Sequence, residues 1–232
     1  NSRADSVLLA GAESNVVESD NRLVSIAREL LEAPYAAGTM IGDPDIPEQL
    51  VCRSDSLDCM CYLDIILAKF MTPGSESDTA LFCSALIKQR YFGAQISYQN
   101  RHHFFTDWIE SGPLLIDAGG SFAGAKLTPV DINCRQNGSV WSKGIECKQR
   151  DVFHVPAKES TLSDLEAGDL VGFWTGIPGL DVTHVGLIDI VEDEVILLHA
   201  SSKSLQVVAE PLKNHPAWKN GLIVLRLNKA PK

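Results

Sequence analysis

Residues 183–201 read THVGLIDIVEDEVILLHAS, two apolar runs on either side of the polar pair Glu192-Asp193. Apolar and β-branched runs separated by two turn-forming residues are typical of a β-hairpin. The stretch therefore predicts antiparallel strands at 184–191 and 194–199, joined by a two-residue turn. This hairpin is the centre from which the rest of the fold is predicted.

The same hairpin brings two histidines together. If Glu192-Asp193 forms the turn, counting back along both strands sets Gly186 opposite His199. His184 is two residues from Gly186 and points to the same face, so the two histidines are diagonal neighbours, about 7 to 8 Å apart at the backbone. A three-residue turn would reverse one of them. The open alternative is that each histidine sits at a sheet edge with a local hydrogen bond.

The hydrophobic periodicity differs between the two halves of the chain. In the second half, further short apolar runs lie at 169–174, 205–209 and 222–227. In the first half, apolar residues at helical spacing predict helices at 20–32, from about Cys59 to Phe70, and at about 77–90. Helices followed by strands predict an α+β fold, with N-terminal helices packed on a C-terminal antiparallel β-sheet.

One domain is predicted over 19–232. Residues 1–18 carry little pattern and are expected to form an N-terminal arm. Glycine, proline and polar residues dominate 112–160, which predicts an elaborated loop region within the domain. Ser56 or Asp58 can cap the helix that begins near Cys59. The buried side of that helix is predicted to hold Ile65, Ile66, Ala68 and Phe70, and the following helix to turn Leu81, Ala85 and Ile87 inward.

The composition is that of a folded, acidic protein. Hydrophobic residues make up 45% of the 232 residues, and the formal net charge is -10. Acidity disfavours nucleic acid and anionic membrane surfaces as partners, because phosphate binding needs a basic surface. No apolar run approaches the roughly 20 residues of a membrane helix.

Six cysteines are more than an intracellular protein of this size usually needs. Cys134 and Cys147 flank a polar, turn-rich stretch that a disulfide could hold together, and both the paired and the unpaired state remain open. Cys83 is interpreted as a core cysteine, and Cys52 is unassigned. Because the numbering begins at Asn1 without an initiator methionine, we expect that a signal peptide has been removed and that the protein is periplasmic or secreted.

Cys59 is the candidate nucleophile. On the first turn of its helix, unpaired backbone N–H groups and the helix dipole favour a thiolate. A nucleophilic thiol also needs a base and a third group that orients the base, roles that the two histidines could fill. From the local sequence alone, Cys59 and Cys61 remain open as small core residues. A zinc site at Cys59-Met60-Cys61 is disfavoured, because one-residue spacing is poor for chelation.

The remaining histidines are less informative. His102 and His103 precede an aromatic segment and are interpreted as structural, with Arg101 facing an open groove. His154 and His215 lie in polar segments and are predicted to face solvent. The chain has no glycine-rich phosphate loop, no Gly-x-Ser-x-Gly elbow and no His-Glu-x-x-His helix.

Several short motifs follow one another in a distinctive order. They are Pro34–Thr39 (PYAAGT), Leu57-Asp58-Cys59 at a helix start, Arg101–Trp108 (RHHFFTDW), Leu165–Val171 (LEAGDLV) and the two histidine motifs 183–186 and 198–201. In this order and spacing they resemble the N-acetylmuramoyl-L-alanine amidase-like family of the NlpC-type papain-like cysteine peptidase superfamily. The resemblance runs from about Leu23 to Leu227.

The resemblance implies a papain-like (NlpC-type) fold, in which the helix with the nucleophile packs against the sheet with the base. On the matching positions, Cys59 is the nucleophile, His184 the base and His199 the orienting residue. Tyr35 and Asp58 correspond to positions that line the substrate cleft, and Arg101 is a further substrate-binding candidate. Two departures are Met60, where a serine often follows the nucleophile, and the second cysteine, Cys61.

The activity that the resemblance implies is a cysteine amidohydrolase acting on bacterial peptidoglycan or muropeptides, with no cofactor and no metal. The favoured bond joins the muramyl lactyl group to L-alanine. Three alternatives remain: a D-glutamyl-diamino acid endopeptidase, a non-catalytic binder of peptidoglycan fragments, and an effector that cleaves another amide. The oligomeric state is not predicted.

Overall fold

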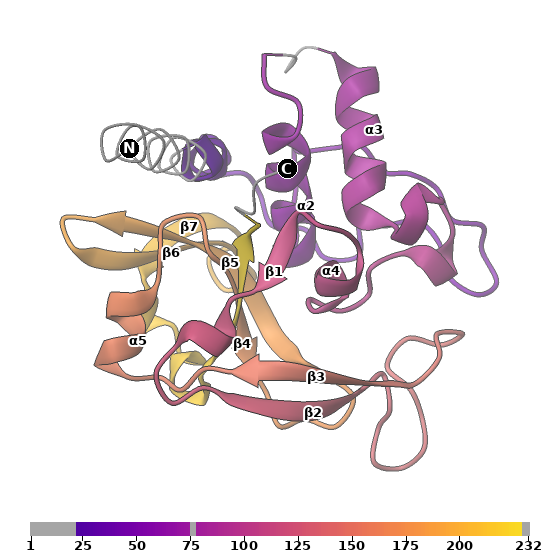
Figure 1. The fold of residues 1–232 in the computed structure, drawn as a ribbon. Helices are drawn as coiled ribbons and strands as arrows, with labels where there is room; N and C mark the ends of the chain where they lie inside the picture. The colour runs from indigo at the N-terminus through magenta and orange to yellow at the C-terminus, as the bar shows by residue number, and fades with distance from the viewer. Residues whose placement is uncertain (1–21, 75–77, 229–232) are drawn as a thin grey trace, which may run out of the picture.

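The computed structural model describes residues 22–74 and 78–228 of the chain. The predicted arm at 1–18 and the first two residues of the helix predicted at 20–32 lie outside these residues, and 22–29 is helical as predicted. Helices from the first half meet an antiparallel sheet from the second half (Figure 1), which confirms the α+β prediction. In the described residues, no helix has the length and apolar character needed to cross a bilayer.

Besides the helix at 22–29, the described residues contain four α-helices and five single 3-10 turns. The α-helices are α2 (Cys59–Phe70), α3 (Thr79–Arg90), α4 (Asp107–Glu110) and α5 (Glu159–Asp164). Single 3-10 turns are η1 (Phe92–Ala94), η2 (Tyr98–Asn100), η3 (Gly119–Ser121), η4 (Leu212–Asn214) and η5 (Trp218–Asn220).

Six strands form the main sheet, in the order β1-β8-β4-β5-β6-β7, and every neighbouring pair is antiparallel. The strands are β1 (Leu115–Asp117), β4 (Leu170–Trp174), β5 (Val182–Val191), β6 (Glu194–Ser201), β7 (Gln206–Pro211) and β8 (Leu222–Leu227). The five predicted strands correspond to β4 through β8, with ends that differ by at most two residues. The edge strand β1 was not predicted.

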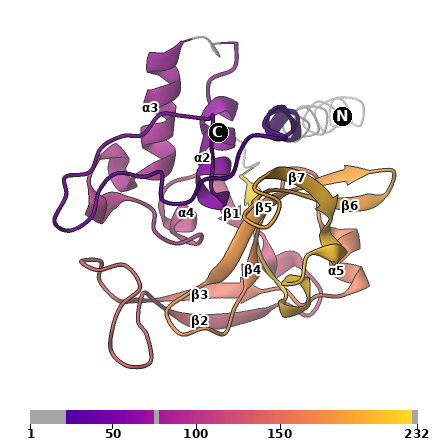
Figure 2. The same ribbon diagram turned by 180° about the vertical axis from the view of Figure 1, so that it is seen from behind.

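The sheet separates two hydrophobic clusters. Successive residues along a strand point to opposite faces, and Leu197 and Leu198 of β6 accordingly belong to different clusters. The first cluster contains the apolar side of α2, where Ile65 and Ile66 are fully buried. The second cluster includes Phe173 and the partly buried Leu162 of α5. Seen from behind, α2 and α3 stand well apart from α5 (Figure 2).

Helix α2 is fixed at its start and along its side. Asp58 is its N-cap, accepting a hydrogen bond from the Cys61 N–H at 2.8 Å, so Asp58 rather than Ser56 fills the predicted capping position. A buried ion pair, Arg90 Nε to Asp64 Oδ2 at 2.8 Å, joins α3 to α2. The prediction for Leu81 is wrong, because α3 buries residues of its C-terminal half and leaves Leu81 48% exposed.

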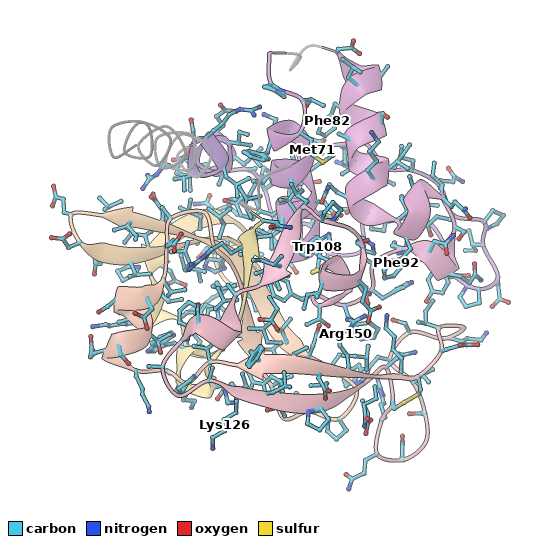
Figure 3. All side chains as sticks on the ribbon, in the orientation of Figure 1. Met71, Phe82, Phe92, Trp108, Lys126 and Arg150 are labelled. Carbon is cyan, nitrogen blue, oxygen red and sulfur yellow. A yellow bond between two sulfur atoms is a disulfide. The ribbon has the colours of Figure 1, made fainter. Side chains whose placement is uncertain are left out.

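The region predicted as an elaborated loop contains a second, two-stranded sheet. Its strands β2 (Lys126–Ile132) and β3 (Lys148–His154) pair over their full length. Arg150 of β3 reaches the helical part of the molecule (Figure 3), where its guanidinium contacts Asp107 at 3.0 Å and Glu110 at 2.8 Å. This ribbon was missed because its long connection is rich in glycine and polar residues, whereas the strands themselves carry the period-two alternation only weakly.

Four of the six cysteines form disulfides. The Cys134–Cys147 bridge closes the connection between β2 and β3, which confirms the paired alternative. Cys52 pairs with Cys83 across 31 residues. The interpretation of Cys83 as a core cysteine is wrong, because Cys83 lies on a half-buried face of α3 that meets the loop before α2, where it pairs with Cys52. Cys59 and Cys61 are the free thiols.

Candidate active site

Cys59 lies at the first turn of α2, beside two of the predicted substrate-binding residues. Asp58 precedes it as the N-cap. Tyr35 is held nearby because it pairs with Leu57 in an isolated β-bridge. The pKa of Tyr35 is raised by burial and then by the proximity of Cys59 and Asp58. The structure therefore brings Tyr35 and Asp58 together with the predicted nucleophile.

The thiol of Cys59 is protonated at neutral pH. Burial first, and the charge of Asp58 second, raise its pKa to about 11, while the backbone N–H groups of Val185, Cys59 and Met60 act in the opposite direction. The prediction of a thiolate at the helix start is wrong for this resting site. The N–H groups contribute as expected, but loss of hydration and the capping carboxylate outweigh them.

The histidine pair forms as the hairpin count predicts. Val191 pairs with Glu194 and Leu187 with Leu198, so the register sets Gly186 opposite His199. His184 Nε2 lies 2.6 Å from His199 Nδ1, and the two rings are nearly perpendicular at 85°. Both histidines thus face the same side of the sheet, and the sheet-edge alternative is wrong for them.

A carboxylate extends the histidine pair and fixes its protons. Glu210 Oε1 of β7 lies 3.0 Å from His199 Nε2. Because a carboxylate only accepts, His199 carries its proton on Nε2 and presents a bare Nδ1. His184 then donates its Nε2–H to His199 and keeps a lone pair on Nδ1. Burial, with His199 and His215 nearby, lowers the pKa of His184 to about 3, and burial lowers that of His199 to about 4.

His215 joins the pair from the segment after η4. Its ring stacks on Phe173, with centroids 4.1 Å apart, and lies parallel to His184 at 5.2 Å. Ring nitrogens of His184, His199 and His215 all lie within 4.8 Å of one another, a group that can hold a metal ion. The prediction that His215 faces solvent is wrong, because Phe173 and His184 cover it. His154 is likewise half-buried and stacks on Trp174 at 4.8 Å.

A β-bulge lies at His184. Between Gly172 and Trp174, β4 has one residue, whereas β5 has two, Thr183 and His184, between the paired positions Val182 and Val185. Two residues opposite one define a bulge, which bends the strand and re-aims a side chain, and bulges are common beside active sites. The base predicted from the sequence therefore sits at the one irregular point of the β4–β5 pairing.

The two halves of the site meet at Val185. This residue directly follows His184, and its backbone N–H acts on the Cys59 thiol. In the described residues, no hydrogen bond joins Cys59 to His184. The His184 ring lies beside Phe173 of the second cluster, whereas Cys59 packs against the first cluster. The backbone of the predicted base thus adjoins the nucleophile, and its imidazole is turned toward His199.

Arg101 is paired rather than free. Its guanidinium contacts both carboxylate oxygens of Glu48 at 3.0 Å, and the Glu48 side chain is almost fully buried. Arg101 lines a cavity of about 350 Å³ together with His103, but its charge is already neutralised there. The structural interpretation of the neighbouring histidines fits their contacts: His102 packs edge-on against Phe92, and His103 Nε2 lies 2.8 Å from the Tyr98 carbonyl.

Sequence reasoning missed Glu210 and His215. Glu210 of β7 pairs with Leu197 of β6, so the contact between Glu210 and His199 depends on the β6–β7 register. The hairpin count did not cover that register. A count from the turn between these strands could have found it. His215 follows a 3-10 turn and has no periodic signal.

Comparison with solved structures places this fold among known ones. An N-acetylmuramoyl-L-alanine amidase from Bacteroides uniformis superposes with a TM-score of 0.71 at 26% sequence identity, covering 90% of this chain and 99% of that one. A protein from Legionella pneumophila has a TM-score of 0.73 over 98% of this chain and 97% of its own, but at 19% identity it supports the fold alone. No curated protein matches the sequence.

The sequence profile of one family covers most of the chain. The AmiA-like family, described as N-acetylmuramoyl-L-alanine amidase-like, matches residues 25–222. That span includes Cys59, the histidine cluster and Glu210. The chain therefore belongs to the N-acetylmuramoyl-L-alanine amidase-like family of peptidoglycan hydrolases.

Proposed function

We propose that this protein cleaves an amide bond of peptidoglycan through a cysteine mechanism, with Cys59 as nucleophile, His184 as base and His199 as the orienting residue. One observation carries the proposal. The hydrogen bonds from Glu210 through His199 to Nε2 of His184 leave Nδ1 of His184 as a free lone pair, on the strand that adjoins the thiol. Family membership supports the substrate class.

The reaction starts from neutral groups. With the pKa of His184 near 3 and that of Cys59 near 11, imidazole and thiol are both uncharged at neutral pH. Nδ1 of His184 accepts the thiol proton as the sulfur attacks the amide carbonyl. In the substrate-free structure the His184 ring lies with Phe173 and not with Cys59, so this step requires the ring to turn toward Cys59 at the β-bulge when substrate binds. Catalytic hydrogen bonds often form fully only in the substrate complex.

The charges formed in the reaction have partners nearby. The backbone N–H groups of Cys59 and Met60 lie beside the sulfur and can donate to the developing oxyanion. His199, held by Glu210, stabilises the imidazolium of His184. That imidazolium gives its proton to the leaving amine, and a water activated by His184 then releases the acyl group from Cys59. No step of this scheme uses a cofactor.

The finer assignments belong to the same proposal. Resemblance to the family motifs favours the NlpC-type papain-like superfamily and the bond between the muramyl lactyl group and L-alanine. Two disulfides in one chain favour an oxidising location, periplasmic or secreted. Tyr35 and Asp58, which flank Cys59, are the residues we assign to substrate binding, and Arg101 acts more remotely through its ion pair with Glu48.

Mass spectrometry of digested muropeptides tests the assigned bond. The amidase releases a peptide that begins with L-alanine and a sugar that ends in the free lactyl carboxylate. A product in which L-alanine stays on the sugar would reject the amidase assignment and favour the D-glutamyl-diamino acid endopeptidase. Binding of muropeptides without any turnover would favour the non-catalytic alternative.

A further inference from the structure

We propose that His184, His199 and His215 form a binding site for a divalent transition-metal ion such as Zn²⁺, and that metal binding there switches the hydrolase off. Three imidazoles with nitrogens within 4.8 Å of one another are the basis of the proposal. Imidazole is a preferred ligand for zinc, copper and nickel, and three histidines with an open fourth position are a known zinc arrangement.

The distances are close to those of a bound ion. Two imidazole nitrogens on a tetrahedral zinc lie about 3.4 Å apart, since each Zn–N bond is about 2.0 to 2.1 Å. The His184–His199 pair, at 2.6 Å, has to open by less than an ångström. The widest of the separations between the ring nitrogens, which is within 4.8 Å, has to shorten by somewhat more than an ångström to reach this value. His215 lies in a connecting segment between two 3-10 turns, so it can make that shift without breaking a strand pairing.

The surroundings of the cluster fit a metal site. Glu210 holds the outer nitrogen of His199 at 3.0 Å, and a carboxylate on a ligating histidine fixes its ring and increases its basicity. Phe173 packs against both His215 and His184, with ring centroids 4.1 and 6.2 Å away, and limits access of water. Within the described residues, no Lys or Arg side chain forms a hydrogen bond or an ion pair with any of the three histidine rings. A positive charge in such a contact would oppose a bound cation.

The inhibitory effect rests on the proposed function. An ion on Nε2 of His184 takes the place of the proton that His184 donates to His199. The neutral ring then carries its proton on Nδ1, the atom that we propose takes the proton of the thiol. The base is lost without any change at Cys59, and removal of the ion restores the original tautomer.

Metal binding can be measured separately from hydrolysis. The full-length protein is stripped with a chelator, the chelator is removed, and Zn²⁺ is titrated in competition with a chromogenic zinc indicator. We expect one equivalent to bind. His215→Phe, which keeps a ring against Phe173, should weaken binding by more than tenfold, and Glu210→Gln by about tenfold. Cys59→Ala should bind as tightly as the wild type. His215→Gln serves as a second variant at the same position, in case His215→Phe misfolds. Circular dichroism of each variant checks that it is folded.

Two results would overturn the metal site. One is equal affinity in the wild type and both His215 variants. The other is loss of binding in Cys59→Ala, or a cobalt–thiolate charge-transfer band when Co²⁺ replaces Zn²⁺, since either would place the ion on the thiol.

The inhibition is tested in a separate assay. Each variant's rate with Zn²⁺ is compared with its own metal-free rate, and half-inhibition of His215→Phe should need more than tenfold higher Zn²⁺ than the wild type. Activation by Zn²⁺ would overturn the inhibitory role. Binding without any cysteine-dependent turnover would reject the proposed function and leave the metal site standing.

Discussion

The start of α2 and the histidine cluster of His184, His199 and His215 suppress charge in opposite ways. At Cys59, burial and the Asp58 carboxylate disfavour the anion and raise the thiol pKa to about 11. At His184, burial and two neighbouring imidazoles disfavour the cation and lower the pKa to about 3. Each region thus stores a neutral group, and a proton transfer between them creates both charges at once. Under the proposed mechanism, the comparison predicts a site that substrate activates rather than one poised as an ion pair.

Loss of the nucleophile should produce the largest effect. Cys59→Ala is expected to abolish hydrolysis of muropeptides while leaving the fold intact, because no other group supplies the attacking sulfur. Cys61→Ala is the matched control, since Cys61 is the other free thiol, on the same helix but buried against Thr39. Turnover is followed by chromatography of the products. If Cys59→Ala remains active and Cys61→Ala does not, the nucleophile has been assigned to the wrong cysteine.

The substitution Glu210→Gln alters the histidine cluster and leaves the start of α2 unchanged. The amide oxygen can still accept from His199, but it carries no charge to stabilise the imidazolium, so kcat should fall by about tenfold at unchanged KM. Glu210→Ala should lower kcat further, because the His199 tautomer is then no longer fixed. Steady-state kinetics on a purified muropeptide provides the measurement. A change confined to KM would mean that Glu210 contacts the substrate instead.

The pH profile distinguishes the neutral pair from an ion pair. A base with a lowered pKa is active until the pH falls to that value, so kcat/KM of the metal-free enzyme should stay high down to about pH 4. Because the pKa of the Cys59 thiol is raised, the change of kcat/KM on the alkaline side should begin only above about pH 9. A bell with an alkaline limb near pH 8 and loss of activity as imidazolium deprotonates would instead indicate a preformed thiolate–imidazolium pair.

Gly186→Ala should have the smallest effect of these changes on the reaction. A Cβ there would lie 2.7 Å from Leu197 Cδ1 and 3.1 Å from His199 Cβ. We expect a loss of about 1 to 3 kcal/mol in unfolding free energy from overpacking. The accompanying loss of activity should be a few-fold, because His199 is displaced while Cys59 is untouched. Chemical denaturation and kinetics measure the two effects, and an unaltered stability would mean that the strand shifts freely.

The features predicted from the sequence are those fixed by local chemistry. The Glu192-Asp193 turn was predictable because both residues adopt positive φ, 50° and 66°, as a two-residue hairpin turn requires. That turn then fixed the His184–His199 pair. Asp58 was predictable as a cap from its position before an apolar helical run.

The features that escaped prediction depend on tertiary contacts. The raised pKa of Cys59 comes from burial against segments far away in sequence, and the Cys52–Cys83 bridge joins residues 31 apart. The Glu210 contact depends on a strand register that the first hairpin does not set. His215 is brought in by ring stacking on Phe173 and by a hydrogen bond from the Ala217 N–H to its Nδ1, neither of which has a periodic sequence signal. The assignment of Cys59, His184 and His199 as catalytic remains a prediction from residue types and family motifs.

The pairing of cysteines has a consequence for oxidative damage. With four of the six thiols in disulfides, Cys61 is the one thiol that could trap a sulfenic acid formed on Cys59. Residues two apart on an α-helix point about 200° away from each other, so these sulfurs cannot meet while α2 is intact. Within the described residues, Cys59 thus has no resolving cysteine, and we expect an external thiol to be needed to reverse peroxide damage at Cys59 before it proceeds to the sulfinic acid.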